Sequence, residues 1–399
     1  MNIRFSRETF GLVKLYSASF LMAFGPGMIL PAIPLIAASF KISVGLAAQL
    51  ITALALGRAI AQIPGGLIVD RRGSKFALIL STFLAATGAL VAASTPLFSL
   101  LLLALFLMGT AQSVWMLGRE VAGIDLVRHD QRGRMMSGFF GFSSAGEAMG
   151  PVVGGILADR IGYRVVFIIY LFIAVAVFLT SLTISEKRKE HKELGPLTFR
   201  LAKFWEIDKA YRTTYLVLVF TTFTMMLYRT TLHSMLPLFV VTQLGFSTTQ
   251  VGTLFGITGI CVLVMIVPAG FITDKLGRKV ATVPSTALPA IAFVAYPFSD
   301  SMLQLSILAA LIGISNGLSL GSVATSTYDV IPEKSRGQLQ GLRRTIGDIG
   351  GISGPLLGGI IADAYNPGTT FLIYFPLLLL AAALLAFASR ETLGRTNPR

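Results

Sequence analysis

Long apolar stretches recur along the whole chain and limit the folds that are open to it. Each is close to or above the roughly 20 residues that a helix needs to cross the hydrocarbon of a bilayer. A soluble domain would carry about 25% charged residues, whereas this chain of 399 residues carries 13%. The pattern predicts an all-α membrane protein with twelve transmembrane helices. They lie approximately at 11–37, 44–69, 75–94, 97–124, 135–158, 164–184, 211–242, 247–273, 279–297, 301–328, 337–363 and 368–389.

The net charge of +14 is distributed unevenly between the two sides of this predicted bundle. With the N-terminus inside the cell, the Lys and Arg residues outside the spans all fall on the cytoplasmic side, apart from Lys41, Arg160 and Arg164. Such a bias sets the orientation of membrane proteins. It therefore predicts cytoplasmic termini in a cell (inner or plasma) membrane, and it accounts for the basic charge without a nucleic-acid partner.

The sequence also repeats itself at a constant offset of 204 residues. A fixed offset over most of a chain indicates two similar structural units. We expect one six-helix bundle in 1–184, a charged cytoplasmic linker in 185–210 and a second bundle in 211–399. Two such repeats in parallel orientation, related by a pseudo-twofold axis along the membrane normal, are a known transporter plan with the substrate site between them.

Two loops at equivalent places in the repeats carry the same pattern of glycine, acidic and basic residues. Their sequences resemble the signature G-x-x-x-D-[RK]-x-G-[RK]-[RK] of the major facilitator superfamily, and the first copy differs from it only at Ser74. The resemblance implies two six-helix bundles that work by alternating access. The residues that carry it are Gly66, Asp70, Arg71, Gly73 and Lys75, and then Gly270, Asp274, Lys275, Gly277, Arg278 and Lys279.

The resemblance also implies that these loops latch the cytoplasmic side in the outward-facing state. A carboxylate such as Asp70 is favoured at a helix N-terminus, and Arg343 or Arg344 would be a further partner for it. The alternative is that the loops only cap turns and set the topology.

A glycine-rich pattern on the predicted fifth and eleventh spans resembles the motif G-x-x-x-G-P-x-x-G-G, which is typical of exporters in this superfamily. Leu105 stands where such exporters usually carry an arginine, so their proton–drug exchange does not transfer directly. Small residues four apart also permit close helix packing in any membrane protein, which is the alternative reading. The motif residues are Gly146, Gly150, Pro151, Gly154, Gly155, Gly350, Gly354, Pro355, Gly358 and Gly359.

Charged residues inside apolar spans are costly and are candidates for function. Glu147 and Asp348 are the candidates for proton coupling, because desolvation in an apolar helix disfavours the charged form of a carboxyl group. The alternative is structural pairing, for example of Arg58 with Asp348 or of Arg119 with Glu147. The candidates for lining a substrate cavity are Arg58, Trp115, Arg119, Glu120, Tyr228, Arg229 and His233.

Together these features predict a secondary active transporter of a small organic compound, more specifically a proton-coupled exporter. The alternatives are an organic-anion or metabolite carrier that uses Arg119, Arg229 and His233, and a receptor or scaffold without flux. No nucleophile–base arrangement, metal-ligand spacing or G-x-x-x-x-G-K-[ST] loop is present in the sequence, so we expect no enzyme, metal or cofactor other than the coupling proton. The expected partners are the substrate and the lipid bilayer, and a monomer suffices.

Overall fold

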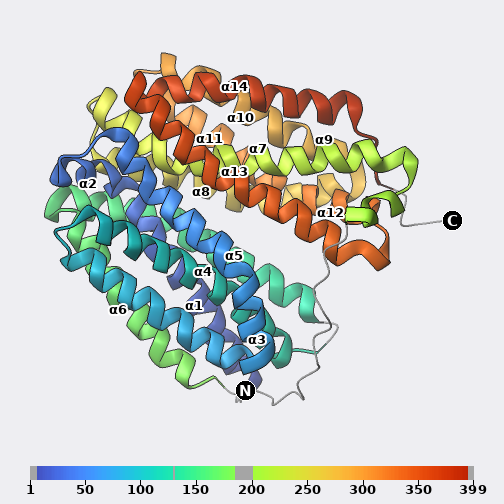
Figure 1. The fold of residues 1–399 in the computed structure, drawn as a ribbon, viewed down its shortest axis with the longest axis horizontal. Coiled ribbons are helices and arrows are strands. Elements are labelled where there is room, and N and C mark those ends of the chain that lie inside the picture. The colour runs from blue at the N-terminus through green and yellow to red at the C-terminus, as the bar shows by residue number, and fades with distance from the viewer. Residues whose placement is uncertain (1–6, 129–130, 185–200, 394–399) are drawn as a thin grey trace, which may run out of the picture. The chain divides into compact units, whose positions relative to one another are not determined.

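The computed structural model describes residues 7–128, 131–184 and 201–393, and most of these are helical, with no β-strand among them (Figure 1). Ten segments of this described part are long and apolar enough to cross a membrane. One of them, Val44–Ser94, is 51 residues long and contains two of the predicted spans. The glycine-rich helix Arg132–Ile161 is not among the ten but covers the predicted span at 135–158. The twelve predicted spans thus fall in helical segments, although 301–328 is interrupted at Leu320 and Gly321, between two helices.

The chain forms two compact units. The first comprises Met1–Glu193 and Phe246–Gly256, and the second comprises Leu194–Gly245 and Ile257–Arg399. The predicted linker 185–210 lies partly outside the described residues, which resume in the 3₁₀ helix Leu201–Glu206. The helices of the first unit are α1 (Arg7–Ile29), α2 (Ile33–Phe40), α3 (Val44–Ser94), α4 (Phe98–Leu126), α5 (Arg132–Ile161) and α6 (Tyr163–Leu182).

The second unit is built in the same way from shorter helical pieces. Its helix α8 is shared between the units, because Phe246–Gly256 packs with the first. The helices are α7 (Arg212–Leu238), α8 (Thr248–Phe271), α9 (Arg278–Thr282), α10 (Pro284–Ala295), α11 (Met302–Ser319), α12 (Ser322–Val330), α13 (Arg336–Ala364) and α14 (Pro367–Ala383).

A glycine breaks the helical path at the same position of both repeated loops. Gly73 interrupts α3 with φ 87° and ψ 168°, and Gly277 precedes α9 with φ 133° and ψ 151°. Residues with a Cβ rarely adopt these angles. The glycine at this place in the loop motif is thus required by the backbone turn itself.

The glycine-rich motif brings helix backbones into contact in both units. A methyl group at Gly146 on α5 would stand 2.3 Å from the carbonyl oxygen of Phe20 on α1. In the second unit, a methyl group at Gly350 on α13 would stand 2.2 Å from the carbonyl oxygen of Phe223 on α7. Neither site has room for a larger residue, so the motif fixes the α1–α5 and α7–α13 packing.

The start of α8 packs against α5 just as closely. A methyl group at Gly252 would stand 2.4 Å from the carbonyl oxygen of Pro151, and the Thr249 hydroxyl donates to Asp159 Oδ2 at 2.9 Å. This contact explains why Phe246–Gly256, which belongs by sequence to the second repeat, groups with the first unit.

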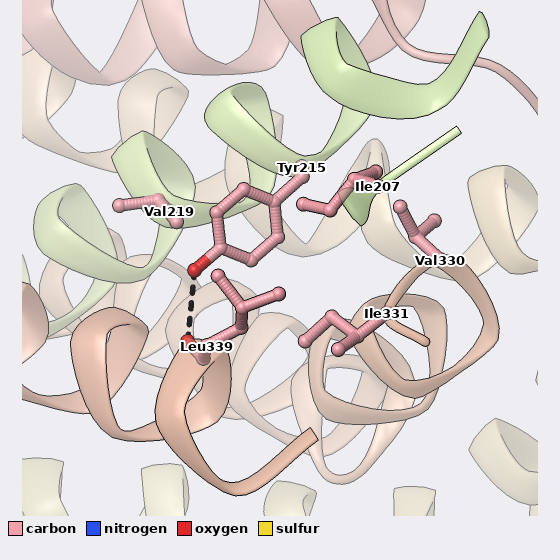
Figure 2. Close-up of a cluster of buried hydrophobic side chains, with 6 residues drawn as sticks. All are labelled: Ile207, Tyr215, Val219, Val330, Ile331 and Leu339. Atoms are coloured by element: carbon pink, nitrogen blue, oxygen red, sulfur yellow. Dashed lines mark hydrogen bonds between the residues drawn. The ribbon is translucent and has the colours of Figure 1, made fainter. Parts of the chain in front are cut away.

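A buried apolar cluster joins the last part of the predicted linker to the rest of the second unit. Figure 2 shows Tyr215 on α7 at its centre, with its hydroxyl directed at the backbone of Leu339. The hydroxyl donates to the Leu339 carbonyl oxygen at 2.8 Å. Ile207 packs against the same cluster, so the chain is anchored to α7, α12 and α13 directly before it enters the membrane-spanning part.

Candidate functional site

Arg119 is the most deeply buried of the predicted cavity residues with a charge. It lies on α4 with 4% of its surface exposed. Its Nη1 donates to Ser143 Oγ on α5 at 2.9 Å, and its guanidinium carbon lies 4.8 Å from the centre of the Phe139 ring. A cation over an aromatic face is stabilised by the ring quadrupole. Arg119 is thus held between α4 and α5 by one polar and one aromatic contact.

Two carboxylates attract the charge of Arg119. Glu120 is its neighbour in the chain and Glu147 lies on α5. Glu147 lies on an exposed face of that helix. The surrounding protein therefore does not desolvate Glu147, and the argument for a function of Glu147 rests on its proximity to Arg119.

Trp115 lies one helical turn before Arg119 on α4 and is 3% exposed. Within the described residues, its indole Nε1 and the Nε of Arg119 are buried donors without a hydrogen-bond acceptor. Buried donors without acceptors are uncommon, and each one calls for an explanation. Trp115 and Arg119 are both predicted cavity residues, and they lie on the same face of α4.

Arg229 has a different environment in the second unit. It is half-buried near the middle of the α7 span, and it donates from Nε to Asn316 Oδ1 at 2.9 Å and from Nη2 to Ser319 Oγ at 2.5 Å. Both acceptors are neutral and lie on α11. His233, also half-buried, follows one turn later on α7.

Tyr228 is fully buried and binds the same asparagine as Arg229. Its hydroxyl donates to Asn316 Oδ1 at 2.8 Å and lies 3.5 Å from Ser315 Oγ. Ser315 in turn donates to the carbonyl oxygen of Ser285 on α10 at 2.7 Å. The network runs from α10 through α11 to Arg229.

The remaining charges predicted inside spans lie on α3 and α13. Arg58 is half-buried in the first part of α3, and Asp348 is half-buried on α13. Arg344 is exposed, whereas Arg343 is 8% exposed and donates to Gln340 Oε1 and Thr222 Oγ1, both at 2.9 Å. Arg343 thus takes part in the α7–α13 packing.

In the second motif loop, Arg278 connects three parts of the second unit. Its Nη1 donates to Asp274 Oδ1 at 2.8 Å and to the Thr273 carbonyl oxygen at 2.9 Å, and its Nε donates to Asp329 Oδ2 at 3.1 Å. Lys279 donates to the Ala386 and Ser389 carbonyl oxygens at 2.7 and 3.0 Å. The predicted loop residues are therefore tied both to the end of α12 and to the end of the last span.

Glu391, after the last span, completes this loop and was not predicted. Its carboxylate accepts from the backbone N–H groups of Arg278, Lys279, Thr392 and Leu393 at 2.8 to 3.0 Å. Burial opposes ionisation of Glu391, but the four N–H donors outweigh it and hold the pKa of this carboxyl below its usual range. The sequence signal was an acidic residue directly after an apolar span.

The first motif loop has no arginine at the equivalent place. Ser74 stands at the position of Arg278 and is buried at 3% exposure, while Asp70 and Arg71 are exposed. The Arg72 guanidinium lies over the Phe76 ring at 4.9 Å. The two loops share their backbone turn but differ in the side chain at this position.

Over the described ranges, no group of three or more His, Cys, Asp or Glu residues is placed to hold a metal ion. Sequence reasoning missed Ser143, Asn316 and Ser319 as partners of the arginines. Small polar residues in spans are too common to single out without the fold. The structure brings Trp115, Arg119 and Glu147 together in the first unit, and Tyr228, Arg229 and His233 in the second.

A chain with repeated membrane-spanning helices, two copies of one loop motif and charged residues inside its spans has the organisation of a multi-pass membrane transporter. The chain belongs to the Major Facilitator Superfamily, whose model matches residues 15–226 and 218–399.

Relatives and solved structures agree with this assignment. The chain is 26% identical over 361 residues to an uncharacterised MFS-type transporter of Methanocaldococcus jannaschii, covering 88% of this chain and 90% of the relative. It is 26% identical over 346 residues to the multidrug resistance protein MdtG of Dickeya zeae, covering 81% and 79%.

Two solved structures share the fold at low sequence identity. A bacterial homologue of the human lysosomal transporter Spinster gives a TM-score of 0.76 at 17% identity, with 98% of both chains covered. The nucleoside transporter NupG gives 0.78 at 12% identity, with 94% of this chain and 99% of that one covered.

Proposed function

We propose that this protein is a proton-coupled exporter of a small organic compound and that Glu147 carries the coupling proton. The observation that supports it most directly is the attraction between Glu147 and the buried Arg119 on the neighbouring helix. Protonation of Glu147 removes this attraction, so the α4–α5 interaction differs between its two protonation states. A coupling ion needs only such a difference in free energy between conformations.

The similarity to MdtG proteins supports export, since these relatives are named multidrug resistance proteins. The glycine-rich motif on α5 and α13 is consistent with it. Asp348 on α13 is the second candidate for the proton site. The two motif loops are proposed as cytoplasmic latches, with Arg278 as the central residue of the second.

The test uses purified protein in liposomes with an imposed pH gradient and a panel of labelled cationic, neutral and anionic compounds. The wild type is expected to accumulate at least one compound against its gradient. Glu147→Gln is expected to lose this accumulation but to keep exchange of the compound without a gradient. Asp300→Asn, which neutralises an exposed carboxylate just before α11, is the control and should keep both.

The proton-site proposal is wrong if Glu147→Gln and Asp348→Asn both accumulate the compound like the wild type. The exporter proposal is wrong if the pH gradient drives no compound of the panel.

We also propose an inner or plasma membrane location with both termini in the cytoplasm, and a monomer that needs no cofactor or protein partner. Protease cleavage of tags at the two ends, in right-side-out and inverted vesicles, tests the orientation. Cleavage of either tag from the outside would overturn it.

A further inference from the structure

Arg229 lies inside an apolar span, where a positive charge is energetically costly. It lies near the middle of the span that runs from Lys209 to Gln243, and it is half-buried. Charged side chains at such depth face the bundle interior or a water-filled cavity, because exposure to lipid is costly. The side chain therefore marks a polar site in the second unit.

The hydrogen bonds of Arg229 orient it without neutralising it. Its acceptors, Asn316 and Ser319, are an amide and a hydroxyl, so the net positive charge of the guanidinium remains. Arg119 in the first unit differs in this respect, because Glu120 and Glu147 attract its charge.

A hydrogen-bond network that includes Tyr228 and Asn316 fixes the orientation of the Arg229 side chain. The Tyr228 hydroxyl and the Arg229 Nε both donate to Asn316 Oδ1, which fixes the amide between them. The bonds of Arg229 use Nε and Nη2, and the end of the guanidinium formed by Nη1 and Nη2 still has hydrogens to donate. Two parallel N–H groups at this end match the two oxygens of a carboxylate or phosphonate.

We propose that the transported compound carries an anionic group, a carboxylate, phosphonate or phosphate, and that Arg229 binds it. Asn316, Ser319 and Tyr228 are positioning residues, since they act through Arg229. This inference names the substrate class of the function proposed above and rests on it.

The test is thermal unfolding of the full-length protein in detergent at constant ionic strength. The probes are benzoate, phenylphosphonate and phenyl phosphate, with benzamide as the uncharged match. At least one anion is expected to raise the Tm in a saturable way, because a ligand that binds only the folded state stabilises it. Benzamide is expected to have no such effect.

Variants then locate the site. Arg229→Gln is expected to weaken the apparent affinity for the anion about tenfold or more, as loss of a charged hydrogen-bond donor does. Arg229→Lys should weaken it less, because the charge remains without the two-pronged geometry. Arg160→Gln, which removes an exposed charge at the end of α5, is the control and should bind like the wild type.

Asn316→Asp gives a second test that does not remove the arginine. It puts a carboxylate beside Arg229 in the place of the amide, so the anion is expected to bind at least tenfold more weakly. Asn316→Ala should reduce the affinity less.

The inference is overturned if no anion of the three stabilises the protein, or if Arg229→Gln and the wild type bind the anion equally. These outcomes are distinct from failure of the proposed function. An anion that binds through Arg229 in a protein without pH-driven flux supports the site and contradicts the proton-coupled exporter. Flux of cationic or neutral compounds without anion binding supports the exporter and contradicts the anion site.

Discussion

Arg119 and Arg229 are two arginines at membrane depth in two units of similar build, and their surroundings differ. Arg119 is almost fully buried, rests on an aromatic ring and is attracted by two carboxylates. Arg229 is half-buried and donates to neutral oxygens only through Nε and Nη2. At the offset of 204 residues, Val323 stands opposite Arg119 and Gly25 opposite Arg229. The units therefore share their packing, whereas the positions of their charges are their own.

The motif loops show the same division. Gly73 and Gly277 adopt equivalent turns with positive φ. Arg278, which binds two carboxylates in the second loop, is replaced by Ser74 in the first. Backbone constraints have kept the repeat recognisable, and side-chain chemistry distinguishes the two copies.

The largest expected effect tests the shared packing. Gly146→Ala and Gly350→Ala each place a methyl group within 2.3 Å of a backbone oxygen, and each is expected to lower the free energy of unfolding by about 2–3 kcal/mol. Thermal unfolding in detergent measures it. Gly141→Ala and Gly341→Ala are controls on the same two helices, because no atom lies within 4 Å of the added methyl. They should be neutral or stabilising by up to about 1 kcal/mol. A cost in one unit only would break the equivalence.

The next effect separates the two arginines. Arg119→Met loses a hydrogen bond and the contact with Phe139, and it is expected to lower the free energy of unfolding by about 2 kcal/mol. Arg229 donates only to neutral acceptors, so its charge is not balanced by a hydrogen-bonded carboxylate. Arg229→Met removes this charge and should therefore leave the free energy of unfolding unchanged or raise it. The same unfolding assay compares them. Equal losses for both variants would show that Arg229 is a structural residue.

A smaller effect is expected in the motif loops. Arg278→Ser makes the second loop like the first at this position and removes hydrogen bonds to Asp274, Asp329 and the Thr273 carbonyl. We expect a loss of about 1–2 kcal/mol. Ser74→Ala is the matched change in the first loop and should cost less. Hydrogen exchange of the two loops reports each separately, and equal protection of both loops in Arg278→Ser and wild type would contradict the prediction.

The smallest expected effect is the loss of the stability that Glu391 contributes, as the pH falls. The pKa of Glu391 is lower in the folded protein than its ordinary value, so its contribution to stability is complete above that ordinary value and is lost as the pH falls through the lowered pKa. The protection factors of the backbone amides of 278, 279, 392 and 393, taken relative to their intrinsic exchange rates at the same pH, should therefore fall on acidification. Glu391→Gln should have the lower protection factors already at neutral pH and show little further change. Protection factors of the wild type that do not change with pH would refute this role for Glu391.

The sequence was sufficient for the features that depend on the backbone. Span length predicted the helices, and the glycines at 73 and 277 marked turns that no other residue adopts easily. Glu147 was singled out as a carboxyl in an apolar helix, and the structure places it on an exposed face of that helix. Asn316 and Glu391 could not be chosen, since their importance depends on which helix end or guanidinium lies beside them. Contacts between residues far apart in the chain require the folded structure.

The packing of Phe246–Gly256 against α5 bears on the order in which the protein is made. A methyl group at Gly155 would stand 2.5 Å from the carbonyl oxygen of Thr248, so the first unit is covered here by residues synthesised after α7. A nascent chain that has reached only the linker still exposes this glycine surface to lipid or to the insertion machinery. The first repeat is thus completed only when the ribosome has passed residue 256, well into the second.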